Sequence, residues 1–332
     1  MSELRLRSAL RPSVSLPSLL AFSLVGIALA GGCSDDDPSG SGTAGSGGSS
    51  MAGSAGSMAG NGTSGSGMAG SGMQAGASCD GLLFCDDFES FPAGAPPGGD
   101  WGAQQTNGSV TVDTERAFSG QSSVKATTLS TAASGSTYKA AFINLSTAVF
   151  PREDNAVYGR MMFYLESAPL ANVHWTIVDA TGDIAGEDYS ATYRYGGQLP
   201  IPEGGPFTGN QLMANYDTVD FYGTPSVGPN TDCYRHANGT PVPVGSWTCA
   251  EWFFDGQANA MRFWLDGEEI SAIAIDGTGD GCVAQPADYT WTAPSFSRID
   301  VGWESYQEDD ERTIWIDDVA IGTERIGCPA AP

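Results

Sequence analysis

Tyrosines that alternate with arginines are the residues of this sequence best suited to contact sugars. In segment 157–165, Tyr158, Arg160, Met162 and Tyr164 alternate with apolar residues, so they share one face of a strand. Sugars stack on aromatic rings, and a guanidinium pairs with carboxylates. The pattern favours a sugar groove, although a half-exposed sheet face has the same alternation.

The following segments repeat this chemistry. Segment 173–178 contains His174, one of only two histidines, Arg194 lies between two tyrosines, and segment 211–216 ends in Asn215 and Tyr216. Histidine and tyrosine can act as general acids or bases, and arginine can bind anions. We therefore expect these side chains to meet in one groove. For His174 the alternative is a core histidine bonded to the backbone.

Two carboxylates interrupt a strongly apolar stretch near the end of the chain. Segment 313–321 is apolar on both alternating faces, as in a strand buried between two layers, but contains Asp317 and Asp318. A buried, unpartnered carboxylate is costly, so a cation or dense hydrogen bonding must compensate. Segment 82–89 has a matching acidic and apolar character. We expect the two segments to be neighbours around a calcium ion; hydrogen-bonded acids without a metal are the alternative.

The elements that position these residues read as short strands throughout residues 79–332. No helical periodicity persists there, and alternating segments are separated by Gly, Pro, Asn and Asp. The pattern predicts an all-β, concanavalin A-like jelly-roll sandwich. The main expected strands lie at 108–113, 122–129, 138–146, 157–165, 173–178, 193–198, 211–216, 247–254, 261–265, 301–306 and 313–321.

The first 78 residues have a different composition. Basic residues followed by the apolar run 19–30 predict a signal peptide over 1–32, too short to span a bilayer. Cys33 follows small residues, as in a bacterial lipobox, although Ala30 stands where leucine is usual. Residues 33–78 are rich in Gly, Ser, Ala and Met and predict a disordered tether. We expect lipidation at Cys33 and a monomeric protein on the outer membrane or at the bacterial cell surface, touching membrane only through the lipid; the alternative is an ordinary cleaved signal.

Charge and cysteine count narrow the possibilities. The formal net charge of −25 argues against nucleic-acid binding, which needs a basic surface. Besides Cys33 there are six cysteines, an even number that predicts three disulfides in an exported domain and allows fifteen pairings. A zinc site is a poor alternative because the sequence has no close Cys-x-x-Cys pair.

Five short motifs in this order resemble the glucuronan lyase family (polysaccharide lyase family 20) and the related fungal cellulose-induced secreted proteins. The resemblance spans about 86–328 and implies a jelly roll with a sugar groove, a structural calcium and cleavage of uronic-acid polymers by β-elimination. The motifs are Asp86-Asp87-Phe88-Glu89-Ser90, Phe118-Ser119-Gly120, Arg194-Tyr195-Gly196-Gly197-Gln198, Gly302-Trp303-Glu304-Ser305-Tyr306 and Trp315-Ile316-Asp317-Asp318.

The resemblance also implies particular ligands and cross-links. Calcium ligands fall on Glu89, Ser119, Ser122 and Asp317, and oxygen donors from distant segments suit calcium. Cysteines in the family pair Cys249 with Cys328. Cys233 and Cys282, which we place in long polar loops, form a second pair, and Cys79 and Cys85 remain as a local clasp.

Groove residues implied by the resemblance are Arg160, His174, Arg194, Gln198, Trp303, Glu304 and Tyr306. β-Elimination needs a group that neutralises the uronate carboxylate, a base for the C5 proton and an acid for the leaving oxygen. Arg194, Gln198 or Asn215 suit the first role, and His174 or a tyrosine (Tyr306 or Tyr216) the others. Thr192 stands two residues before Arg194, where the resemblance allows a groove histidine.

We interpret the chain as a calcium-stabilised protein that binds acidic polysaccharide, with lyase activity as one possibility and non-catalytic binding on the same fold as the other. A laminarinase-type hydrolase is rejected because the sequence lacks a Glu-x-Asp-x-x-Glu run.

Overall fold

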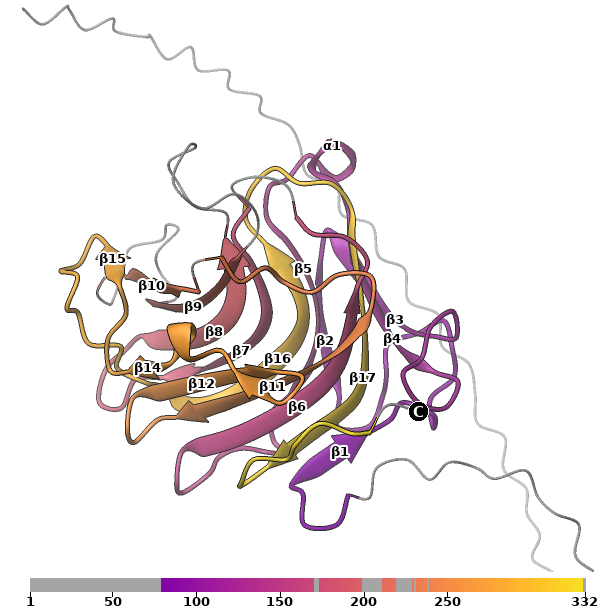
Figure 1. Cartoon of the computed structure of the whole chain (residues 1–332), viewed down its shortest axis with the longest axis horizontal. Coiled ribbons are helices and arrows are strands. Elements are labelled where there is room, and N and C mark those ends of the chain that lie inside the picture. Colours follow the sequence, from indigo (N-terminus) through magenta and orange to yellow (C-terminus); the bar gives the residue numbers. More distant parts are fainter. Residues whose placement is uncertain are drawn as a thin grey trace, which may run out of the picture. The chain divides into compact units, whose positions relative to one another are not determined.

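The computed structural model describes residues 79–169, 173–198, 211–218, 229, 231–237 and 239–330. In these residues the strands form two antiparallel sheets, and the expected all-β jelly-roll sandwich is confirmed (Figure 1). Helical structure in this part is confined to α1 (Thr131–Ser134) and the 3-10 turn η1 (Ser271–Ile273), neither of which is long and apolar enough to cross a bilayer. Cys33, the predicted signal peptide and the tether lie outside the described residues.

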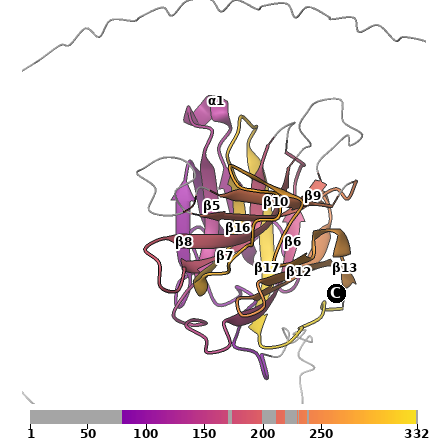
Figure 2. The same ribbon diagram turned by 90° about the vertical axis from the view of Figure 1, so that its left-hand side faces the viewer.

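Sheet A and sheet B form the two layers, with β5, β7, β8 and β16 in one layer and β6, β12 and β17 in the other (Figure 2). Sheet A has the strand order β13 (Glu268–Glu269), β12 (Ala260–Leu265), β11 (Trp247–Asp255), β6 (Ala156–Leu165), β17 (Arg312–Gly322), β4 (Ser123–Thr128) and β3 (Gly108–Asp113), with β1 (Phe84–Asp86) beside β17 and β14 (Ile275–Asp276) beside β12. Sheet B has the order β15 (Gly281–Val283), β10 (Asp232–His236), β9 (Gln211–Thr218), β8 (Ser190–Gln198), β7 (Trp175–Asp183), β16 (Ser295–Ser305), β5 (Lys139–Leu145) and β2 (Gly102–Thr106).

Strand β17 joins the two ends of the domain. Every one of its residues is buried, as its apolar composition predicts. Its first half pairs with β4 and its last part with β1, where Phe84 lies opposite Ile321 and Asp86 opposite Val319. The expected neighbourhood of the terminal segments is therefore confirmed.

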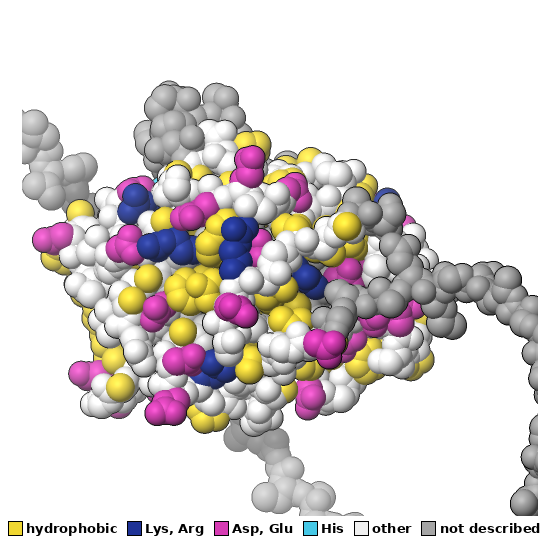
Figure 3. Space-filling model, turned by 60° about the horizontal axis from the view of Figure 1, so that its bottom comes forward, with side chains coloured by type: hydrophobic (Ala, Val, Ile, Leu, Met, Phe, Trp, Pro, Cys, Tyr) yellow, Lys and Arg dark blue, Asp and Glu magenta, His cyan; other side chains and the backbone are white. Residues whose placement is uncertain are grey.

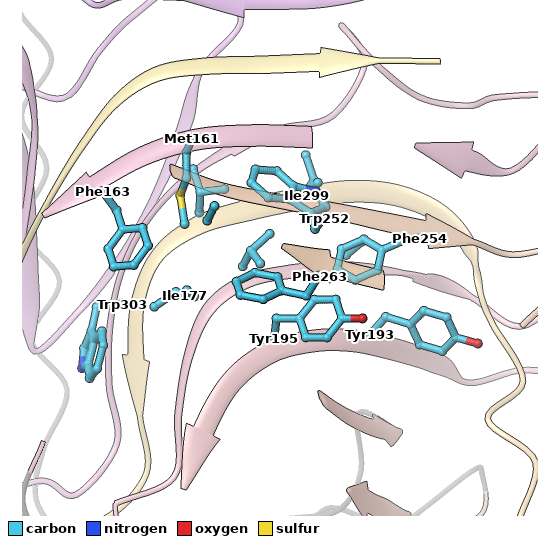
Figure 4. Packing of buried hydrophobic residues seen from close by; sticks show 14 of the residues in the cluster. Met161, Phe163, Ile177, Tyr193, Tyr195, Trp252, Phe254, Phe263, Ile299 and Trp303 are labelled. Carbon is cyan, nitrogen blue, oxygen red and sulfur yellow. The ribbon is translucent and has the colours of Figure 1, made fainter. Parts of the chain in front are cut away.

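Large aromatic side chains fill the space between the sheets (Figure 4). Trp175 of β7 and Trp303 of β16 stack with ring centroids 5.1 Å apart. Trp252 of β11 lies across Gly159 of β6, where an added Cβ would come within 2.1 Å of its ring. Only glycine leaves room for this contact, which explains the interruption of the apolar alternation in β6.

Three disulfides fasten the described residues in the expected pairs: Cys79–Cys85, Cys233–Cys282 and Cys249–Cys328. The placement of Cys233 and Cys282 in long loops was wrong. They belong to the short strands β10 and β15, in which they are directly opposite each other. These strands are brief and polar, so their alternation is too short to identify them from sequence.

Candidate functional site

The face of sheet B that points away from the core is polar. In β16, Ile299, Val301 and Trp303 join the core, whereas Asp300 and Glu304 point to the opposite face. This follows from the alternation of side chains along a strand. The same alternation in β8 puts its tyrosines in the core and Arg194 on the outer face.

The register aligns one polar row across six neighbouring strands. Asp179 of β7 is the centre of this row, between Asp300 of β16 and Arg194 of β8. Taken across the sheet, the row consists of Asn144, Asp300, Asp179, Arg194, Asn215 and Tyr234. The polar row therefore runs perpendicular to the strands.

Arg194 is the hub of the hydrogen bonds beside this row. Its Nη1 lies 2.5 Å from Glu304 Oε2, and its Nε lies 3.1 Å from Asp217 Oδ2. It also donates to the hydroxyl of Tyr306, which in turn donates to Glu304 Oε2 at 2.5 Å. Tyr138 donates to the other oxygen of Glu304 at 2.8 Å. The guanidinium is thus held by two carboxylates and a phenol.

A hollow of about 260 Å³ opens over this cluster. Its wall includes Arg194, Glu304 and Tyr306, three of the residues expected in the groove. The other lining residues are Gln104, Tyr138, Phe142, Asp179, Thr181, Thr192, Asp217, Thr218 and Arg298. We call this hollow, together with the polar row, the groove.

Burial perturbs the acids of the groove. Burial raises the pKa of Asp179 well above its usual range, and the facing charge of Asp300 raises it further. Burial also raises the pKa of Asp300, with the nearby Arg298 opposing the rise. Two facing carboxyls in a dry site therefore keep a proton to higher pH than isolated aspartates. Burial raises the pKa of Asp217 to about 6, although Arg194 opposes the shift.

Two proton-carrying side chains adjoin at the edge of the groove. The rings of His174 and Tyr306 have centroids 5.3 Å apart. Burial, followed by the charge of Arg194, lowers the pKa of His174 to about 3, so its imidazole is neutral at pH 7. Burial is also the main cause that raises the pKa of Tyr306, which keeps its phenol protonated. The pair thus offers a neutral imidazole beside a phenolic proton.

Gln198 and Asn215 occupy less direct positions. Gln198 ends β8, next to Gly197, which pairs with Trp175; it does not line the hollow. Asn215 belongs to the polar row, but its amide donates to Asp232 Oδ1 at 2.8 Å and to the carbonyl of Cys233 at 2.9 Å. Its amide protons are therefore already committed within the sheet.

Four expected groove residues lie elsewhere. Arg160 and Tyr164 belong to sheet A. Arg160 donates to the carbonyls of Gly327 and Asp318. The guanidinium carbon of Arg116 lies 4.3 Å from the ring centroid of Tyr164. Figure 3 shows the underside of Figure 1, where β1, β6, β11 and β12 lie; basic and hydrophobic side chains adjoin there. Tyr216 and Trp303 point into the core, because each adjoins in sequence a residue that faces the groove.

Sequence reasoning missed Tyr138, Asp179, Asp217 and Asp300. Asp179 and Asp300 interrupt apolar strands in the same manner as Asp317, and this signal was available. It was obscured because the register of β7 shifts between Thr176 and Val178, which breaks the simple alternation. Tyr138 begins the expected strand 138–146 and lies just before β5 in the structure, but this segment has no alternation of polar side chains that marks the tyrosine.

The expected calcium ligands gather around one loop. Glu89 Oε1 accepts the backbone N–H groups of Gln121 and Ser122 at 2.7 and 2.6 Å. Asp317 Oδ2 accepts those of Phe118 and Ser119 at 2.7 and 3.2 Å. Gly120 lies against Glu89 with a φ of +62°, and a Cβ there would meet the carboxylate at 2.4 Å.

These residues fit a hard cation. Burial, and next the charge of Asp318, raise the pKa of Asp317 to about 8, despite three backbone hydrogen bonds. A divalent cation would relieve both effects, and carboxylate and hydroxyl oxygens are the donors that calcium prefers. Glu89 and Asp317 would supply charge, and Ser119 and Ser122 neutral oxygens. In the described residues Cys249, Glu251 and Cys328 also adjoin, but their two sulfurs form a disulfide.

The family described as polysaccharide lyase-like, Cip1-like core domain, matches residues 99–324. No curated protein matches the chain in sequence.

Three solved structures illustrate the range of similar proteins. Cellulose-induced protein Cip1 has 23% identity over 74% of this chain and 100% of its own, with a TM-score of 0.49. Alginate lyase Aly36B has 9% identity over 74% and 98%, with a TM-score of 0.41. A pseudo β-1,3-glucanase of Mycobacterium tuberculosis has 15% identity over 74% and 100%, with a TM-score of 0.42.

Proposed function

Because the chain belongs to the Cip1-like, polysaccharide lyase-like family, we propose that it binds a polysaccharide chain along the groove of sheet B. The observation that carries this proposal is the hollow of about 260 Å³, which is lined mainly by polar side chains. Sugars need several hydrogen-bonding groups on one surface, and the partly exposed Gln104, Thr181 and Arg298 provide them. Asp300 and Asn215 of the polar row, in contrast, are 1% exposed and lie beneath that surface. The rings of Tyr138 and Tyr306 add apolar area at one wall.

Tyr138 gives a direct test of the proposal. It is half-buried and lines the hollow, whereas Tyr158 is equally half-buried on sheet A, stacked on Phe253. Affinity electrophoresis in gels that contain a panel of soluble polysaccharides measures retardation of the wild type and both variants. We expect Tyr138→Ala to abolish retardation and Tyr158→Ala to retain it. Equal retardation of both variants would place binding outside the groove.

β-Elimination is the second candidate, and the cluster of His174, Tyr306 and Arg194 favours it. The phenol of Tyr306 carries a proton that it can give to the leaving oxygen, and the imidazole of His174 is free to accept one, but a pKa of about 3 makes His174 a weak base and counts against this candidate. Arg194 would have to neutralise the uronate carboxylate while it remains paired with Glu304 and Asp217. Thr192, whose hydroxyl donates to Thr181 at 3.2 Å, supplies no base.

Ultraviolet absorbance of unsaturated uronates tests this candidate over a panel of polyuronates. If elimination occurs, Tyr306→Phe should reduce kcat by about 10²–10⁴, the usual contribution of a general acid. Tyr158→Phe on sheet A is the matched control and should retain the wild-type rate. Absence of any absorbance change with the wild type leaves binding as the function.

We also propose that calcium binds at Glu89, Ser119, Ser122 and Asp317 as a structural ion. The convergence of these four residues on loop 118–122, the burial of Asp317 and its raised pKa support this. The ion would hold β17 and the segment after β1 to the same loop and take no part in sugar chemistry.

Lipidation at Cys33 and a position at the bacterial cell surface remain proposals that rest on residues 1–78. The monomeric state is likewise a proposal from the sequence. Incorporation of labelled fatty acid into the wild type but not into Cys33→Ser tests the anchor.

A further inference from the structure

Both arginines that line the hollow already hold carboxylates of the protein. Arg194 contacts Glu304 and Asp217 at 2.5 and 3.1 Å, and these three side chains are only 13%, 7% and 17% exposed. Arg298 donates from Nε to Asp300 Oδ2 at 2.7 Å. A ligand carboxylate could bind Arg194 only by displacing a buried acid, which would leave that acid without its counter-charge.

Carboxylates outnumber arginines in this wall. Asp179, Asp217 and Glu304 line the hollow, with Asp300 beside Asp179. An ionised carboxylate only accepts hydrogen bonds, so Asp217 and Glu304, which are paired with Arg194, can bind the hydroxyls of a sugar but not a second carboxylate. The groups facing Asp179 from neighbouring strands are Asp300, Arg194, Glu304 and Arg298. The two positive and two negative charges of these four groups cancel, and Asp217 adds an acidic excess to the wall.

We infer that the groove selects an uncharged, hydroxyl-rich polysaccharide over a polyuronate, because its own carboxylates neutralise its arginines. The inference rests on the proposed function and names the ligand class of the same site. The net charge of −25 acts in the same direction, since it repels polyanions at distances up to the Debye length. The inferred uncharged ligand differs from the acidic polysaccharide expected from the sequence.

The test compares polymers that differ only in charge. Polyglucuronate, polygalacturonate and alginate are each paired with their carboxyl-reduced forms of equal length, and titration calorimetry measures binding to the full-length protein. We expect at least one reduced polymer to bind at least tenfold more tightly than its charged parent, with little dependence on salt. Tighter binding of the charged forms overturns the inference alone. Failure of every polymer, charged and reduced, overturns the proposed function and the inference with it.

A pair of variants tests the physical cause. Glu304→Gln combined with Asp217→Asn frees Arg194, and we expect the affinity for a charged polymer to rise at least tenfold. Glu268→Gln combined with Glu324→Gln removes the same charge from exposed residues and should change nothing. An equal gain in both pairs means that overall charge, not the neutralised arginine, excludes polyuronates, and overturns the assignment to this site. If the first pair fails to fold, Asp217→Asn alone and the wild-type comparison still decide.

Discussion

Arg194 is held in place by two acids, Glu304 and Asp217, that cannot be identified from the sequence around it. Glu304 is 110 residues away in the chain, and Asp217 lies on the neighbouring strand β9. A tyrosine-flanked arginine in a strand indicates which face the guanidinium takes, and this part of the prediction was correct. The partners could not be predicted because they depend on which strands become neighbours.

Replacement of Arg194 by lysine should therefore lower stability. Lysine cannot reproduce the planar fork that reaches both Glu304 and Asp217, so at least one buried charge loses its hydrogen bonds. We expect a loss of about 1.5–3 kcal/mol in denaturant unfolding, the range for hydrogen bonds to charged groups. Arg152→Lys, whose partner Asp154 is 52% exposed, is the control and should cost less than about 1 kcal/mol. Equal losses in both variants would contradict the central role of Arg194.

Asp217 should make stability depend on pH. Its pKa is raised from 3.8 to about 6, so the folded state binds a proton more tightly than the unfolded state. Its contribution is therefore greatest below about pH 4, declines as pH rises and is constant above about pH 7. Unfolding curves across this range should show that Asp217→Asn becomes more stable relative to the wild type as pH rises from about 4 to 6. A constant difference would mean that Asp217 titrates normally.

Alternation along each strand predicted which residues share a face, but not which sheet the strand joins. Arg160 and Arg194 have nearly the same setting in sequence, yet β6 belongs to sheet A and β8 to sheet B. Alternation itself should have separated Trp303 from Glu304 and Tyr216 from Asn215, because sequence neighbours in a strand point to opposite faces. Trp303 and Glu304 were assigned to the groove together because they belong to one family motif, and a motif does not specify which way each side chain points.

The stability of the domain should depend on calcium at loop 118–122, which is held by Asp317 of β17 and by Glu89 after β1. Chelation should lower the melting temperature of the wild type, because metal binding stabilises the folded state by about 3–4 kcal/mol when free calcium is hundreds to a thousand times Kd. Glu89→Gln removes one charged ligand without disturbing the core and should melt at nearly the same temperature with and without chelator. Glu153→Gln, on an exposed turn, should behave as the wild type. If chelator leaves the melting temperature of the wild type unchanged, no bound ion stabilises the fold.

For the molecule as a whole, composition and turn residues sufficed to predict the fold class. The core strands at 157–165, 247–254 and 313–321 were correctly placed because they are long and strongly alternating or uniformly apolar. The order of the strands was not predicted, since pairs such as β16 with β5 join distant segments. The disulfides of the described residues link cysteines at very different separations in the sequence.

Loss of the long-range disulfide should cost more than loss of the local one. Cys249 and Cys328 are 79 residues apart in sequence, whereas Cys79 and Cys85 are 6 apart. By the loop entropy of the unfolded chain, these bonds contribute about 4–5 and about 2 kcal/mol, respectively. Paired alanine variants of each bond, compared by denaturant unfolding, should differ by about 2 kcal/mol. The reverse order would mean that the local bond stabilises the folded state by another route.

The buried position of β17 has a consequence for the newborn chain. On the ribosome, β6 and β4 are made long before Arg312–Gly322 emerges to fill the space between them, and residues 84–86 wait for 319–321. Contacts between such distant segments are slow to form. Until β17 has been made, sheet A therefore has an open seam between β4 and β6. A chain released before residue 312 would have two unpaired edges, on β4 and β6, and would be a substrate for chaperones and proteases rather than a shortened protein.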